Sequence, residues 1–172
     1  MYLFPNLDSK TRELMKHELE MDLADGLFFY PQSLSQYRHE EYVRLMIDTM
    51  ERGTAETLQF GVKPLLVMQN SLNGRKTPRN AAEMVGFSEW NRYYARAMVV
   101  RALEENKGLT VYRAKQVMHE RDDSKYLLQH VYAGEVVLKR MLSILRDYRK
   151  VFDESNPIPF LRPNSGLSVR LA

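Results

Sequence analysis

The sequence predicts a mainly α-helical domain with a minor β component, an α+β fold. Apolar residues recur at helical spacing over most of the N-terminal two thirds and again over residues 125–152. Two short stretches, 109–118 and 166–171, instead have the β-branched or alternating pattern that is typical of strands. We therefore expect one helical domain at residues 1–155, one short strand pair or small sheet, and an extended C-terminal arm at residues 156–172.

Composition excludes several classes of protein. Hydrophobic residues make up 44% and charged residues 27% of the 172 residues, values that exclude a wholly disordered chain. The absence of cysteine excludes disulfide scaffolds, cysteine-ligated zinc, iron–sulfur clusters and thiol nucleophiles. No apolar run approaches the roughly 20 residues that span a bilayer, and Arg12, Glu13 and Lys16 interrupt any signal-peptide pattern. We expect a soluble protein, cytoplasmic or virion-associated, that is neither secreted nor in a membrane.

The first two helices have clear ends in the sequence. The first is expected over residues 9–25, because Asp8 or Ser9 can cap its start and Gly26 follows its end. The second is expected over residues 35–52, with Tyr37 beginning its apolar stripe.

Three further helices follow. Thr54 can cap a short helix that runs through Phe60 and stops before Pro64. After a loop that ends near residue 77, Pro78 favours a helix that ends at Gly86. Ser88 can then cap a longer helix that runs to about residue 106.

The C-terminal third alternates in character. Residues 109–118 are expected to form a strand and residues 125–152 a helix, with a break near Gly134. Prolines at positions 157, 159 and 163 impose an extended segment, and residues 166–171 alternate strictly between apolar and polar, as a strand does.

One charged loop could bind a metal. His119, Glu120, Asp122 and Asp123 offer imidazole and carboxylate ligands for a divalent ion. The alternative is a solvated loop, which we favour because no distant ligand can be identified. We expect no metal, no cofactor and no catalytic residue.

A polar site for a small ligand or a substrate is a second alternative. If the predicted strand lies beside the aromatic helix, Arg92, Arg96, Arg113 and His119 could form a groove for phosphate or carboxylate. We favour a structural explanation, in which Arg92 and Arg96 pair with acidic residues of neighbouring helices or of another subunit.

A helix-turn-helix regulator is the third possibility. The helices predicted within residues 77–101 are joined by a short glycine turn, and residues 82–88 resemble the corresponding stretch of AraC-type regulators. Tyr93 and Arg96 come one residue late for that pattern, which rotates a helical position by about 100°. The nucleic-acid contacts of this alternative would be Arg75, Lys76, Arg79, Arg92 and Arg96.

The C-terminal arm carries the function that we favour. Its strand needs a partner for its backbone groups, either within the chain or on a neighbour. We expect a non-enzymatic structural or adaptor subunit of a homo- or hetero-oligomer, of the kind found in phage capsids, necks or tails. The predicted partner-binding residues are Pro157, Pro159, Phe160, Pro163, Leu167, Val169 and Leu171.

Overall fold

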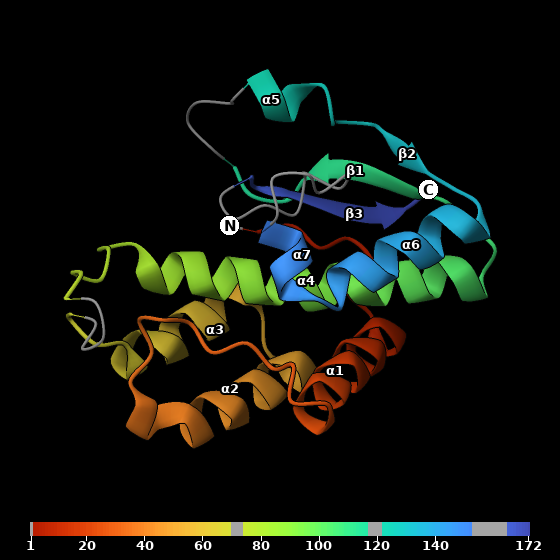
Figure 1. The fold of residues 1–172 in the computed structure, drawn as a ribbon. Helices are drawn as coiled ribbons and strands as arrows, with labels where there is room; N and C mark the ends of the chain where they lie inside the picture. The colour runs from red at the N-terminus through yellow and green to blue at the C-terminus, as the bar shows by residue number, and fades with distance from the viewer. Residues whose placement is uncertain (1, 70–73, 117–121, 153–164) are drawn as a thin grey trace.

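A long central helix, α4 (Ala81–Glu104), separates two layers of the computed structural model (Figure 1). On one side lie α1 (Ser9–Ala24), α2 (His39–Arg52) and α3 (Ala55–Val62); on the other lies a small sheet with the C-terminal helices. The predicted α+β class is therefore confirmed. The structure describes residues 2–69, 74–116, 122–152 and 165–172.

The N-terminal helices begin and end where their caps indicate. Asp8 Oδ1 accepts a hydrogen bond from the Thr11 amide at 2.9 Å, and Gly26 adopts a φ of +67° beyond the end of α1. Thr54 caps α3 by accepting from the Thr57 amide at 3.2 Å. Two 3-10 turns join these helices to their neighbours: η1 (Gln36–Arg38) before α2 and η2 (Lys63–Leu65) after α3.

The prediction of two helices joined by a turn at Gly86 is wrong. Residues 81–104 form one continuous helix, and Gly86 lies inside it. The glycine serves helix packing, because a Cβ at this position would lie 2.7 Å from the Cβ and 2.8 Å from the Cα of Gln59 on α3. A helix-turn-helix geometry is therefore absent from this part of the chain.

Gly86→Ala is expected to destabilise the protein although alanine favours helix. The added methyl group must push α3 and α4 apart, and such overpacking costs about 1–3 kcal/mol. Urea unfolding followed by circular dichroism measures the change, with Ser88→Ala on the same helix as the control. An unchanged or increased free energy of unfolding for Gly86→Ala would contradict the close contact.

Both predicted strands form, and the C-terminal strand pairs within its own chain. Strands β1 (Leu109–Arg113), β2 (Val131–Tyr132) and β3 (Leu167–Leu171) form an antiparallel sheet in the order β2-β1-β3. In its register Val111 lies opposite Val169, and Leu109 lies between Tyr132 and Leu171.

The helix predicted over residues 125–152 is divided into four elements. Short α5 (Asp122–Lys125) is followed by β2, α6 (Glu135–Leu145) and α7 (Tyr148–Phe152). Gln129 and Gly134 adopt positive φ values of 65° and 86°, which no helix interior accommodates. The sequence indicated the break at Gly134 but not β2, which precedes it. The hydrogen-bond partner of β2 is β1, a strand about 20 residues earlier in the chain, and local periodicity does not show such a pairing.

The core lies on both faces of α4. Trp90, Tyr93 and Tyr94 are completely buried because helices cover one side of α4 and the sheet with α6 covers the other. Met15, Met46, Met50 and Met98 are also buried, as expected of core gap fillers rather than of a binding surface. No helix among the described residues is long and apolar enough to cross a membrane.

Candidate functional site

The two arginines predicted to bind phosphate or nucleic acid lie inside the protein. Arg96 is 1% exposed and binds Asp22 of α1 with both terminal nitrogens, at 2.6 and 2.9 Å. Its Nε also donates to Glu18 Oε2 at 2.9 Å. The structural explanation of Arg96 is therefore the correct one: it joins α4 to α1 and is not available to a nucleic acid.

A third helix is joined to the same ion pairs. Arg146, which follows α6, donates to both carboxylate oxygens of Glu18, at 2.6 and 2.9 Å. Burial by itself would raise the pKa of Glu18, but hydrogen bonds and positive charge from Arg146 and Arg96 outweigh it and lower that pKa. Glu18 is thus a charged link between α1, α4 and the end of α6.

Arg92 belongs to a second buried group beside the first. Its Nη2 lies 2.9 Å from Glu89 Oε2 and donates to the Tyr93 hydroxyl at 3.1 Å. Burial raises the pKa of Glu89, and the nearby positive charge of Arg92 only partly opposes this. The Tyr42 hydroxyl is also buried and has no hydrogen-bond partner among the described residues.

These buried charges balance in number and hold helices together. The group contains three carboxylates and three guanidinium groups from three parts of the chain, and only Arg146 reaches the surface. A buried pair contributes little net stability compared with apolar packing, whereas removing one partner is costly. We therefore interpret the group as a device that fixes how the helices pack.

The structure does not bring the other predicted site residues together with Arg92. Arg113 lies on β1 and donates to the Ser165 carbonyl at 3.1 Å. His119 and Glu120, from the metal alternative, lie outside the described residues, as do the side chains of Asp122 and Asp123. Within the described part of the chain, no group of three His, Asp or Glu side chains could hold a metal ion.

The basic loop is on the surface, as the sequence indicated. Arg75, Lys76 and Arg79 are exposed in the segment that leads into α4. Two aromatic side chains on helical segments are exposed as well: Tyr37, which was expected on an apolar stripe, is 98% exposed, and Phe60 of α3 is 74% exposed. Helical periodicity does not indicate this exposure, because it does not show which turns of a helix have a neighbouring element.

The residues of the C-terminal arm divide into two sets. Pro157, Pro159, Phe160 and Pro163 lie outside the described residues. Leu167 and Val169 are completely buried in this chain's own core, and Leu171 is partly buried. The strand thus contributes to the fold of its own chain.

The two edges of the sheet differ. At the outer edge of β3, the Leu171 amide donates to Asn6 Oδ1 at 3.1 Å, and the Leu167 carbonyl accepts from Asn91 Nδ2 at 2.8 Å. Side chains of the same chain therefore bind the outward backbone groups near both ends of β3.

The β2 edge has no such cover within the described residues. Leu109 pairs with Tyr132, and the Val111 amide donates to the His130 carbonyl at 2.9 Å, so the N–H and C=O of Val131 point away from β1. Tyr126, Val131, Val136 and Val137 are all exposed, from 45% for Val137 to 83% for Val136. We call these four residues the β2 margin.

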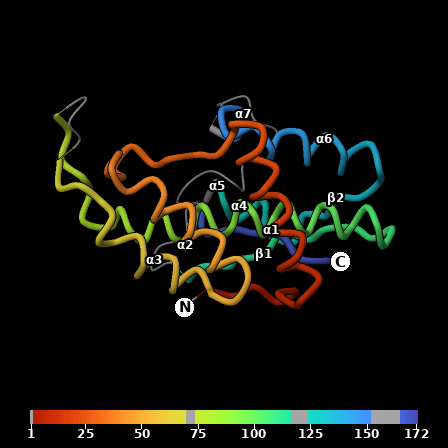
Figure 2. The backbone as a smooth tube through the Cα atoms, turned by 90° about the horizontal axis from the view of Figure 1, so that it is seen from below, coloured from red at the N-terminus to blue at the C-terminus, as the bar shows by residue number. Residues whose placement is uncertain are grey.

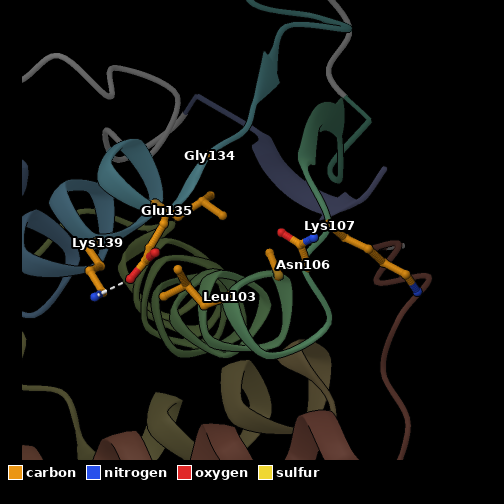
Figure 3. A pocket seen from close by; sticks show the side chains of 8 residues that line it. Leu103, Asn106, Lys107, Gly134, Glu135 and Lys139 are labelled. Atoms are coloured by element: carbon orange, nitrogen blue, oxygen red, sulfur yellow. Dashed lines mark ion pairs between the residues drawn. The ribbon is translucent and has the colours of Figure 1, made fainter.

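A small cavity lies next to this margin, where the end of α4 meets the start of α6 (Figure 3). Its volume of about 190 Å³ is below the roughly 300–1,000 Å³ of typical ligand sites. Glu135 at its rim pairs with Lys139 at 2.5 Å, and Lys107 pairs with Glu105 at 2.9 Å. Its charged side chains are thus already paired, and we assign it no ligand.

The chain was compared with protein-family models, curated proteins and solved structures. No family model, no curated protein and no solved structure matches this chain.

Proposed function

We propose that the protein is a non-enzymatic structural or adaptor subunit that assembles through the β2 margin. One observation carries this proposal: the chain's own side chains bind the edge of the sheet at both ends of β3, whereas within the described residues the edge at β2 presents unpaired backbone groups of Val131 beside exposed apolar residues. An exposed strand edge with apolar surroundings is a site for protein association. The C-terminal strand, which we first expected to bind a neighbour, supports the sheet instead.

The partner that we propose is a second copy of this chain. Two identical β2 edges can meet antiparallel about a twofold axis, so that each Val131 pairs with its counterpart. Charge does not oppose this arrangement, because residues 126–138 contain a single Asp, Glu, Lys or Arg, namely Glu135, and Lys139 pairs with it. We keep a phage virion-type particle, in the cytoplasm or in the virion, as the proposed setting, in which this twofold dimer would be a building unit.

Light scattering on a sizing column tests the interface. The full chain is expected to have a mass of about 40 kDa, twice its 20.2 kDa, at high protein concentration. Val131→Lys combined with Val136→Lys is expected to return the mass to 20.2 kDa with an unchanged circular dichroism spectrum, because each face would then carry two added positive charges.

Tyr37→Lys is the matched control, since this exposed side chain belongs to η1 and not to the margin. It should leave the mass of the full chain unchanged. A wild-type chain that stays at 20.2 kDa at every concentration would overturn assembly through a second copy.

A further inference from the structure

We propose that the end of the molecule opposite the β2 margin binds single-stranded nucleic acid. This inference goes beyond the proposed function and rests on other residues. It concerns three exposed cations, Lys63, Lys76 and Arg79, and three exposed side chains that can contact bases, Tyr37, Phe60 and Met68. We call these six residues the basic end.

Backbone hydrogen bonds hold the segments of the basic end side by side. The Ser35 amide donates to the Leu65 carbonyl at 3.0 Å, and the Thr77 amide donates to the Met68 carbonyl at 2.9 Å. Segments that are distant in the sequence, 33–38, 63–69 and 74–79, therefore meet beyond the start of α4. Phe60 belongs to the last turn of α3, three residues before Lys63, and residues at this spacing are neighbours on a helix surface. Figures 1 and 2 both show them there, at the end of α4 away from β2.

The charge of this end is strongly one-sided. Residues 26–39 and 57–82 contain no Asp or Glu and hold five of the chain's 25 Lys and Arg residues. The rest of the chain then carries 20 cations against 22 acidic residues, so the net charge of +3 arises here. A local excess of this kind attracts a polyanion, because bound phosphates release counterions.

These cations are available. Lys63, Lys76 and Arg79 are exposed and make no ion pair within the described part of the chain. Of the acidic residues nearest to these cations along the chain, Glu83 pairs with Lys115 at 2.7 Å and Glu56 accepts a hydrogen bond from the Tyr2 amide at 2.9 Å. The same excess of charge opposes docking of a second copy at this end.

The exposed rings favour a single strand over a duplex. Two rings are exposed, Tyr37 at 98% and Phe60 at 74%, and the Met68 side chain adds an apolar surface that is 91% exposed. Exposed apolar surface of this extent indicates a contact site. Bases of a single strand can stack on such rings, whereas the bases of a duplex are already stacked on each other. Cations beside exposed rings form the combination that sequence-tolerant single-strand binding uses.

Fluorescence anisotropy with a short fluorescein-labelled oligothymidylate tests the proposal. We expect the full chain to bind it more tightly than a duplex of equal length, with an affinity that falls steeply between about 0.05 and 0.2 M KCl. Lys76→Ala combined with Arg79→Ala should weaken binding and reduce the slope of log affinity against log salt by about 1.4, since each lost phosphate contact removes about 0.7.

Tyr37→Ala should weaken binding by about tenfold and leave the salt slope unchanged, because a ring contributes stacking and no charge. The matched controls lie elsewhere on the surface: Arg52→Ala removes an exposed cation that pairs with Asp48, and Tyr126→Ala removes an exposed ring of the β2 margin. Both controls should bind like the wild type.

Three results would overturn the proposal. The first is an anisotropy of the labelled oligothymidylate that does not change at about 100 μM folded protein in low salt. The second is a duplex that binds as tightly as the single strand or more tightly. The third is polyglutamate that displaces the labelled probe as effectively as unlabelled oligothymidylate does. The last result would indicate an acidic protein partner. Because the probe and the variants differ from those of the light-scattering experiment, failure of one proposal leaves the other standing.

Discussion

A chain that lacks Ser165–Ala172 is expected to lose its cooperative unfolding transition. This deletion removes β3, and with it Leu167 and Val169, both of which are completely buried. Burial of two such side chains stabilises a fold by about 3–6 kcal/mol, a large part of the roughly 5–15 kcal/mol that holds a domain together. The deletion also removes the strand with which all of β1, from Leu109 to Arg113, is paired.

Differential scanning calorimetry of the full and shortened chains measures the effect. Arg170→Ala is the matched control, because this residue lies on the same strand but is exposed, and its loss should cost about 0.5 kcal/mol or less. A shortened chain that still unfolds cooperatively near the wild-type temperature would show that β3 is dispensable. The arm would then again be the first candidate for a contact between subunits.

Arg96→Met is expected to lower the free energy of unfolding at neutral pH by about 3–5 kcal/mol, although methionine fills a similar volume. The reason is charge, because Glu18 and Asp22 would stay buried next to each other without their shared partner. Arg52→Met removes an exposed ion pair with Asp48 and should cost about 1 kcal/mol or less. Adding Asp22→Asn to Arg96→Met should recover part of the loss, since one uncompensated charge is then gone.

The pH dependence separates this cause from a loss of packing. In the wild type the pKa of Glu18 is lowered, so its contribution to stability is present above the unfolded pKa of about 4.3 and is lost as the pH falls through the folded-state value. In Arg96→Met, Glu18 has lost one of the two arginines that lower its pKa, so this contribution is smaller and the variant loses less stability than the wild type as the pH falls. Glu89, whose pKa burial raises, acts in the opposite direction but is common to both proteins.

Urea unfolding at several pH values between about 3 and 7 measures this difference. The gap in free energy between wild type and Arg96→Met should narrow as the pH falls. A gap that is constant over this range would indicate lost packing rather than unpaired carboxylates.

Part of the fold could be predicted because its signals are local. The Asp8 and Thr54 caps satisfy amides only three residues away, and the alternation of β3 follows from side chains that point to opposite faces of a strand. These signals correctly placed α1, α3 and β3. The basic loop at Arg75, Lys76 and Arg79 was likewise found on the surface, because a short polar stretch between helices has little to pack against.

The sequence by itself thus determined the fold class, the main helices, the two longer strands and the excess of positive charge near residues 57–82. Only the tertiary structure decided the roles of Gly86, Arg96 and Tyr37. In the sequence Gly86 indicates a turn, and only its close contact with Gln59 of another helix shows that it serves packing. In the same way Arg96 indicates a phosphate contact, and only its hydrogen bond to Glu18 shows that it is used inside the protein. Contacts between residues far apart in the chain leave no periodic pattern, and they fix which side chains remain at the surface for a partner.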